Sequence, residues 1–126
     1  MPATRILVVD DNPANAKLVA YLLSNSGYEV TTAHDDVSAL ASIKAQPPQL
    51  ILMDVQLPGV DGLELTRRIK ADPKTRDIVV LAVTAYAQRG DEERARAAGC
   101  EGYVTKPINT RALPEIVARY LGKGSQ

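Results

Sequence analysis

Five short apolar segments alternate with five longer segments of helical pattern along the chain. The apolar segments are rich in Val, Ile, Leu and Thr, and several contain no polar residue, which is typical of strands covered on both faces. They lie at Ile6–Val9, Tyr28–Thr32, Leu50–Asp54, Val79–Val83 and Gly102–Thr105. Strands that alternate with helices form parallel sheets, because each helix carries the chain back across the sheet in a right-handed crossover.

The segments between the strands carry the signals of helix ends. Asn12 and Pro13 supply an N-cap and a proline at the first helical position, and Gly27 can end that helix. The other four helices are expected from Asp35/Asp36 to Pro47-Pro48, from Asp61-Gly62 to Asp72-Pro73, from about Arg89 to Gly99, and from Asn109 or Thr110 to Gly122. We therefore predict the α/β class, with a five-stranded, doubly wound (βα)5 sheet of the flavodoxin-like type and strand order 2-1-3-4-5.

Composition is that of one compact domain. The 126 residues hold 15 Lys and Arg against 15 Asp and Glu. Because the chain has no excess of basic residues, we expect no direct contact with nucleic acid. The longest apolar run, residues 78–83, is too short to cross a membrane, and no signal-peptide core precedes Asp10. A single Cys and a single His exclude an intramolecular disulfide and a His-based metal site. We expect a cytoplasmic protein without membrane insertion.

Charged and hydroxyl side chains stand where the predicted strands end. Ligands of doubly wound sheets bind outside the carboxyl ends of the strands, and the residues found there are Asp10, Asp11, Asp54, Thr84 and Lys106. Taken alone, each has an ordinary structural interpretation. The acidic pair would cap a helix, Thr84 would be a β-branched strand residue, Lys106 would be solvated, and Asp54 would accept backbone N–H groups of the next loop.

Taken together, these residues indicate phosphoryl transfer. Three neighbouring carboxylates repel one another and raise each other's pKa unless positive charge lies among them. A hard divalent cation, Mg²⁺ or alternatively Mn²⁺, relieves that repulsion through oxygen ligands, and Lys106 adds a second positive group. A metal, a carboxylate, a hydroxyl and an ammonium are the groups that position and neutralise a phosphoryl group in transfer. We predict that Asp54 is the nucleophile and forms an aspartyl phosphate.

The chain resembles the CheY-like receiver domain of two-component response regulators over residues 4–121. The segments that carry the resemblance are Ile6–Asp11, Leu52–Pro58, Gly62, Val83–Ala85 and Lys106-Pro107. Within the family the chain is most similar to stand-alone, DivK-type regulators and to receivers attached to hybrid kinases. The resemblance implies a receiver at 4–121, a short tail at 122–126 and no output domain. A receiver that belongs to a hybrid histidine kinase is the alternative.

The resemblance also implies which residues hold the metal and accept the phosphoryl group. Asp54 would be the phosphoacceptor. Asp10 and Asp11 would hold Mg²⁺ together with Asp54, and the backbone carbonyl of Gln56 would be a further ligand. Catalysis of this kind would be limited to the protein's own phosphorylation and dephosphorylation, so the chain would act primarily as a signalling switch.

The remaining matching residues would form the switch. Thr84 and Lys106 would contact the phosphoryl group, and the ring of Tyr103 would turn inward when Thr84 moves. Pro107 matches a proline that usually follows a cis peptide bond.

The implied partners are proteins. A sensor histidine kinase or a histidine phosphotransfer protein would donate the phosphoryl group. A downstream protein would bind the face formed by the fourth helix, the fifth strand and the fifth helix, which includes Arg89, Arg94, Tyr103 and Arg111.

Two other classes of protein share part of the pattern. A haloacid-dehalogenase-like phosphatase also uses an Asp nucleophile, but it would need a second acid two residues later, where this chain has Gln56. A nucleotide or flavin binder would need a glycine-rich phosphate loop, and neither GxGxxG nor GxxxxGK occurs. Asp10 and Asp11 would also repel a phosphate at the end of the first strand. Turnover of a phosphomonoester or a bound absorbing cofactor would support these alternatives.

Overall fold

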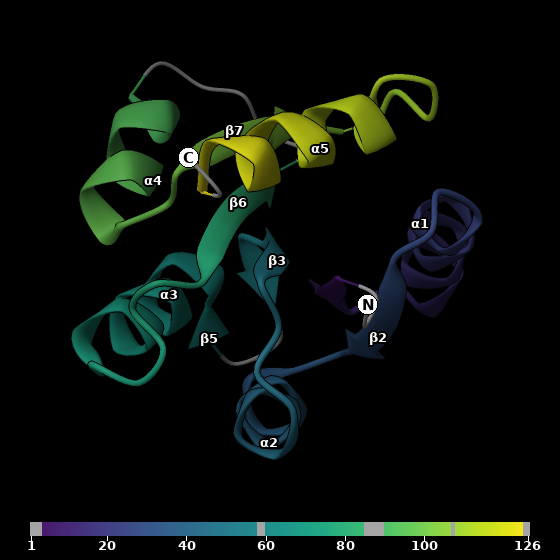
Figure 1. Ribbon diagram of the computed structural model, residues 1–126. Coiled ribbons are helices and arrows are strands. Elements are labelled where there is room, and N and C mark those ends of the chain that lie inside the picture. Colours follow the sequence, from purple (N-terminus) through teal and green to yellow (C-terminus); the bar gives the residue numbers. More distant parts are fainter. Residues whose placement is uncertain (1–3, 58–59, 85–89, 107, 125–126) are drawn as a thin grey trace.

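Five parallel strands form one sheet at the centre of the molecule (Figure 1). The computed structural model describes residues 4–57, 60–84, 90–106 and 108–124. The strands are β1 (Arg5–Val9), β2 (Glu29–Ala33), β3 (Leu50–Asp54), β6 (Val79–Thr84) and β7 (Gly102–Thr105). Their order across the sheet, β2-β1-β3-β6-β7, is the predicted 2-1-3-4-5 when these five strands are numbered along the chain. The doubly wound α/β fold is therefore confirmed.

In the part of the chain that the structure describes, five helices cover the two faces of the sheet (Figure 1). Helices α1 (Pro13–Asn25) and α5 (Leu113–Gly124) lie on one face, and α2 (Asp36–Ala45), α3 (Gly62–Ala71) and α4 (Asp91–Ala98) lie on the other. The predicted caps start the first two helices. The Asn12 side chain accepts the N–H groups of residues 14 and 15, and Asp35 forms a capping box with Ser38.

The last two helices differ from the prediction at their ends. Helix α4 begins at Asp91 and not at Arg89, because Gly90 at its N-cap has φ 90°, outside the right-handed helical region. Arg89 itself lies outside the described residues. The Asn109 side chain accepts N–H groups of residues 111 and 112 and so closes a turn ahead of α5. That helix continues through Gly122 and ends at Gly124.

A small hairpin follows β3 and was not predicted. Strand β4 (Gln56–Leu57) pairs antiparallel with β5 (Val60–Asp61), and α3 begins immediately afterwards. Strands of two residues are too short to show a hydrophobic period, so the sequence pattern carries no signal for them. The hairpin lies directly after Asp54, at the carboxyl end of β3.

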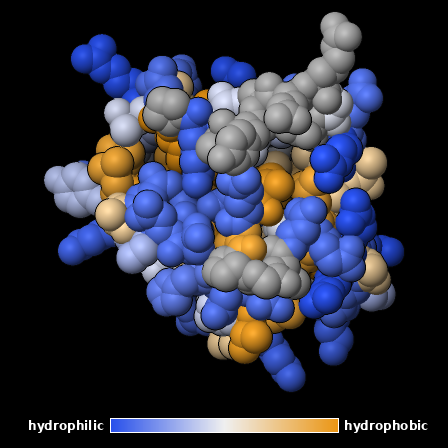
Figure 2. All heavy atoms as spheres, turned by 180° about the vertical axis from the view of Figure 1, so that it is seen from behind, coloured by the Kyte–Doolittle hydropathy of each residue, from blue (hydrophilic) through white to orange (hydrophobic). Residues whose placement is uncertain are grey.

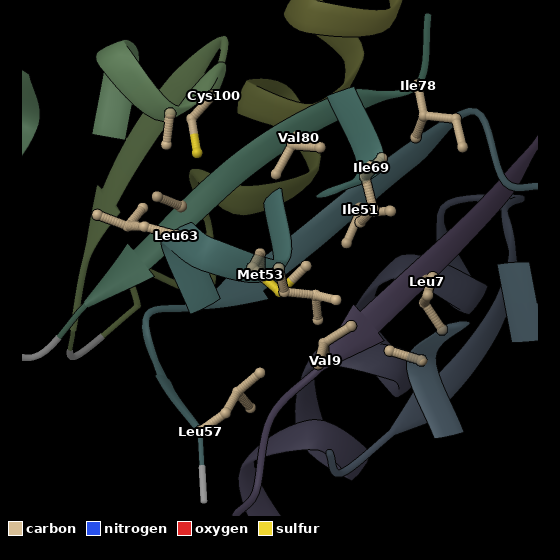
Figure 3. Packing of buried hydrophobic residues seen from close by; sticks show 14 of the residues in the cluster. Leu7, Val9, Ile51, Met53, Leu57, Leu63, Ile69, Ile78, Val80 and Cys100 are labelled. Carbon is tan, nitrogen blue, oxygen red and sulfur yellow. The ribbon is translucent and has the colours of Figure 1, made fainter. Parts of the chain in front are cut away.

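Alternate residues of each central strand belong to two separate hydrophobic cores. Leu7, Val9, Ile51, Met53, Val80 and Ala82 pack with buried residues of α2, α3 and α4 in what we term the three-helix core, part of which Figure 3 shows. The residues between them, Ile6, Val8, Leu50, Leu52, Leu81 and Val83, pack with α1 and α5 in the two-helix core. This alternation follows from the two-residue period of a strand, and it explains why both faces are apolar.

The surface is mixed in character. On the face shown in Figure 2, apolar side chains reach the surface as separate patches among hydrophilic ones. Among the described residues, the large exposed hydrophobic ones are Leu18 and Tyr21 on α1 and Val37 and Leu40 on α2. Within the described part of the chain, no helix has both the length and the apolar character needed to cross a bilayer.

Candidate functional site: an acidic cluster at the carboxyl edge of the sheet

Three carboxylates meet where β1 and β3 end. Asp10 and Asp11 follow β1, and Asp54 is the last residue of the neighbouring strand β3. One carboxylate oxygen from each lies within 4.8 Å of the others. Asp10 and Asp54 are buried, at 4% and 3% exposure, whereas Asp11 is exposed. The predicted grouping is thus confirmed, with two buried acids and one that faces solvent.

Asp10 is held by the segment that starts α1. Its backbone N–H donates to the carbonyl of Ala33 at the end of β2. Its Oδ1 atom accepts the backbone N–H of Asn12 at 2.9 Å, and its Oδ2 atom accepts the side-chain amide of Asn15. Both oxygens therefore have a donor, as a buried carboxylate requires.

Asp54 is held by the loop that leads into the hairpin. Its Oδ1 atom accepts the backbone N–H of Gln56 at 2.9 Å. The intervening Val55 donates its N–H to the carbonyl of Val83 on β6 and accepts the N–H of Gly62 at the start of α3, at 2.9 and 2.8 Å. The backbone directly after Asp54 is thus held by β6 and α3 together.

Lys106 supplies the positive charge that contacts two of the acids. Its Nζ atom lies 3.0 Å from Oδ2 of Asp54 and 3.6 Å from Oδ2 of Asp10. Its backbone N–H donates to the carbonyl of Thr84 at 2.7 Å, which places the end of β7 beside the end of β6. The Lys106 side chain is 24% exposed, so the ion pair with Asp54 is only partly screened by water.

Burial and neighbouring groups shift the pKa values of Asp54 and Lys106. Burial is the largest influence on Asp54 and raises its pKa. The Gln56 N–H and Lys106 lower this pKa, the charge of Asp10 raises it, and the net shift is upward. Burial lowers the pKa of Lys106, but the hydrogen bond and charge of Asp54, with the charge of Asp10, outweigh burial and raise it. Lys106 is therefore held as an ammonium, and one ammonium does not neutralise this carboxylate cluster.

The donor set fits a divalent metal ion. Carboxylate oxygens are the ligands that hard cations such as Mg²⁺ and Mn²⁺ prefer. Three carboxylates within reach of one point form an acidic pocket consistent with such a site. Burial is the main cause of the raised pKa of Asp54, and it disfavours the charged carboxylate, which a nearby cation would stabilise.

The structure describes three of the other four predicted residues. Thr84 is buried at the end of β6, at 4% exposure. Tyr103 lies on β7 opposite Ala82 and packs, half-buried, against the three-helix core. Gln56 is exposed and opens the hairpin. Pro107 and its peptide bond lie outside the described residues.

The sequence analysis did not predict the role of Asn15, the residue of α1 whose side chain binds Asp10. Asn15 stands one helical turn from Asn12, and its amide reaches back to Asp10 because helical side chains lean toward the N-terminus. The backbone hydrogen bonds to Asp10 and Asp54 could have been predicted from the sequence, because an Asp at the start of a loop often accepts a nearby N–H. Asp10 and Asp54 both accept the N–H of the residue two positions later, the usual Asx turn.

Comparisons with known proteins agree with this site. Residues 6–118 match the model of the response regulator receiver domain. The polar-differentiation response regulator DivK of Brucella anthropi is 46% identical over 117 residues, which cover 93% of this chain and 95% of that protein.

Solved structures show the same fold. A CheY-like response regulator receiver domain from Methanospirillum hungatei superposes with a TM-score of 0.91 at 31% identity, over 98% of each chain. The receiver domain of a signal transduction histidine kinase from Syntrophus aciditrophicus superposes with a TM-score of 0.87 at 30% identity, over 96% of this chain and 92% of that one. With its acidic cluster at the carboxyl edge of the sheet, the chain belongs to the response regulator receiver domain family.

Proposed function

We propose that the protein accepts a phosphoryl group on Asp54 from a phosphohistidine and acts as the switch of a two-component phosphorelay. The observation that carries this proposal is the position of Asp54. It is a buried carboxylate at a strand end, 3.0 Å from an ammonium and grouped with two further acids. Membership of the receiver family supports a histidine kinase as the source of the phosphoryl group.

The proposed transfer exchanges one bond to phosphorus for another. An oxygen of the ionised Asp54 carboxylate forms the new P–O bond while the P–N bond of the phosphohistidine breaks. The histidine nitrogen leaves with the electron pair of that bond and can then take a proton. The Gln56 N–H and Lys106 hold the carboxylate in one direction, so little reorganisation is needed during transfer.

We propose Mg²⁺ as the cofactor, with Mn²⁺ as an alternative. Asp10, Asp11 and Asp54 would hold it, together with the backbone carbonyl of Gln56. When bound, the metal would supply positive charge that neutralises phosphoryl oxygens and the acids around them. Lys106, which contacts Asp54 at 3.0 Å, would pair with the phosphoryl group.

The response would spread through Thr84 and Tyr103. Phosphorylation adds negative charge and acceptor oxygens at Asp54, which would attract the Thr84 hydroxyl and Lys106. Full switching from 1:99 to 99:1 requires about 5.5 kcal/mol. Two or three charge-assisted hydrogen bonds at roughly 1.5–3 kcal/mol each are of that order. Movement of Thr84 would leave space for the half-buried Tyr103 ring.

A downstream protein would recognise the face formed by α4, β7 and α5. Exposed Arg94 and Arg111 lie on or next to these elements and would contribute positive charge to this face. We propose a cytoplasmic location, no membrane insertion and no direct contact with nucleic acid. We propose that residues 4–121 act as a stand-alone regulator of the DivK type, with a receiver of a hybrid kinase as the alternative. Similarity to the Syntrophus kinase receiver supports the second arrangement as an alternative.

The test of the phosphoacceptor is direct. The protein is incubated with Mg²⁺ and acetyl phosphate, and its intact mass is measured. We expect the addition of one phosphoryl group to the parent and none to Asp54→Asn. Equal labelling of the two proteins, or no labelling of the parent, would contradict the assignment.

A second test separates Lys106 from metal binding. Lys106→Ala removes the ammonium but none of the three acids, so Mg²⁺ binding should remain. The conformational response, followed by amide exchange in β7 and α4 with and without phosphorylation, should be reduced. A full response in Lys106→Ala would remove Lys106 from the proposed switch.

A further inference from the structure

Asn15 lies beside the acidic cluster and is not one of its acids. Its backbone N–H donates to the side chain of Asn12 at 3.1 Å, which fixes the first turn of α1. Its side chain points back along the helix to Asp10, where the amide meets Oδ2. A carboxylate only accepts hydrogen bonds, so the amide atom that faces it is the nitrogen. Asn15 therefore has two separable roles, one through its backbone and one through its amide.

The amide bond leaves Asp10 able to bind a cation. Each carboxylate oxygen offers two lone-pair directions. The Asn12 N–H occupies one on Oδ1, which keeps its second direction open, whereas Oδ2 accepts the Asn15 amide and is also approached by Lys106. The carboxylate is thus fixed on both oxygens while it retains capacity for a metal ion.

The amide also shares its acceptor atom with Lys106. Oδ2 of Asp10 is the atom that Lys106 approaches at 3.6 Å, while Lys106 lies closer to Asp54 at 3.0 Å. Without a neutral donor on Oδ2, Asp10 would be free to turn toward the ammonium, and a tighter pair would compete with a metal for that oxygen. A lysine or arginine at position 15 would compete in the same way. An uncharged amide is the donor that fixes Asp10 without changing the charge of the cluster.

We propose that Asn15 is a positioning residue for the divalent metal of the acidic cluster, acting through Asp10. The inference rests on the function proposed above, in which Asp10 is a metal ligand. Side chains that orient a metal ligand typically change metal affinity by about 10–100-fold when they are removed. The amide of Asn15 is expected to contribute within that range.

Two variants separate the amide from the rest of the residue. Asn15→Ala removes the amide and keeps the backbone N–H that bonds to Asn12. Asn15→Leu keeps the approximate volume of the side chain but has no donor. Asn15 borders a cavity of about 190 Å³ together with Leu18 and Ile108, so the leucine can be accommodated. Asn25→Ala is the matched control, because Asn25 is exposed at the far end of the same helix.

The experiment is calorimetric titration of the folded proteins with Mn²⁺ and Mg²⁺, together with urea unfolding in the absence of metal. We expect both Asn15 variants to bind metal about 10–100-fold more weakly than the parent and the Asn25 control to bind like the parent. Phosphorylation by acetyl phosphate should slow at limiting Mg²⁺ and recover at saturating Mg²⁺, because the loss lies in metal binding. A purely structural role would lower the free energy of unfolding and leave the metal affinity unchanged.

The outcomes separate this inference from the proposed function. Parent-like metal affinity in a folded Asn15→Leu protein would overturn the role of Asn15 and leave the phosphoacceptor assignment intact. A slow rate in the Asn15 variants that saturating Mg²⁺ does not restore would also overturn it. A parent protein that neither binds metal nor takes up a phosphoryl group would overturn the proposed function itself.

Discussion

The backbone of Gly62 lies against the backbone of Asp54. A β-carbon at position 62 would collide with the carbonyl oxygen of Asp54 and would stand 2.9 Å from the α-carbon of Val55. Atoms do not approach that closely, so any larger residue would push α3 away from the end of β3. The start of a helix and the candidate phosphoacceptor are thus in contact at a point where only glycine fits.

Gly62→Ala is therefore expected to destabilise the protein at or above the upper end of the ~1–3 kcal/mol typical of overpacking. The neighbouring atoms belong to the backbone and cannot rotate away. Gly102→Ala is the control, because its β-carbon would meet side chains, Tyr120 at 2.6 Å and Leu81 at 2.8 Å. Urea unfolding should show a larger loss for Gly62→Ala. A larger loss for Gly102→Ala would contradict this account.

Lys70 connects three segments at the amino edge of the sheet. Its Nζ atom donates to the carbonyls of Arg76 and Ile78 at 3.0 and 2.6 Å and pairs with Glu101 at 2.8 Å. The other Glu101 oxygen accepts the N–H of Val80 at 2.8 Å. Lys70→Met should lower the free energy of unfolding by more than about 3 kcal/mol, because it removes three hydrogen bonds to a charged group that contribute roughly 1.5–3 kcal/mol each.

Two substitutions of Glu101 separate the contribution of its ion pair with Lys70 from that of its hydrogen bond to the Val80 N–H. Glu101→Gln keeps an oxygen for the Val80 N–H and loses only a half-exposed ion pair, so a loss below about 1 kcal/mol is expected. Glu101→Ala removes both interactions and should cost more. Equal losses would show that the bond to Val80 contributes nothing. Phosphorylation at the opposite edge of the sheet should be unchanged in both variants.

Cys100 should be unreactive in the folded protein. The thiol is 5% exposed, and burial raises its pKa from an ordinary value of 9.0 to about 11. Reaction with a thiol reagent at mildly alkaline pH should be slow and should become fast in urea. Rapid labelling of the native protein would contradict the buried position.

The same shift predicts how stability depends on pH. The folded-state pKa of Cys100 lies above the unfolded value, so its contribution is complete below about pH 9 and is lost as the pH rises toward 11. The expected loss is about 2–3 kcal/mol, since each pKa unit corresponds to ~1.4 kcal/mol. Comparison with Cys100→Ala removes the contribution of tyrosines and lysines. A parent and variant with parallel pH profiles would count against the shift.

Divalent metal should stabilise the folded state. An ion that binds only the folded protein adds about 2.7 kcal/mol at 100 times its dissociation constant. Mg²⁺ should therefore raise the melting temperature of the parent, and Asp10→Asn should reduce the increase. Asp77→Asn, at an exposed acid away from the cluster, should retain it. The same increase with KCl at matched ionic strength would show general screening in place of a site.

Most of the fold was predictable because strong local signals agree with one another. The apolar segments predicted the first and last residues of β3 and β7 correctly, and Asn12 and Asp35 were correctly predicted as helix caps. The start of α4 and the end of α5 were less well predicted. Gly90 adopts a positive φ before α4 that the sequence pattern does not indicate, and α5 continues past Gly122, where we expected it to stop.

The candidate site was predictable in its acids and not in their partners. Strand ends place Asp10 and Asp54 side by side whatever the loops do, because the sheet order fixes which strands are neighbours. The amide of Asn15 and the close contact at Gly62 depend on how a helix packs against a loop. Those distances arise from tertiary packing, on which a single sequence carries little information.

The two hydrophobic cores have a consequence for how a change at β7 is communicated. Tyr103 packs against the three-helix core and Val104, the next residue, belongs to the two-helix core. Because α4 rests on the first core and α5 on the second, a displacement of this one edge strand acts on both layers of the molecule at once. A partner that binds α4 and α5 together would therefore contact both layers of the molecule. Its affinity would depend on the position of α4 relative to α5 more than on the position of either helix alone.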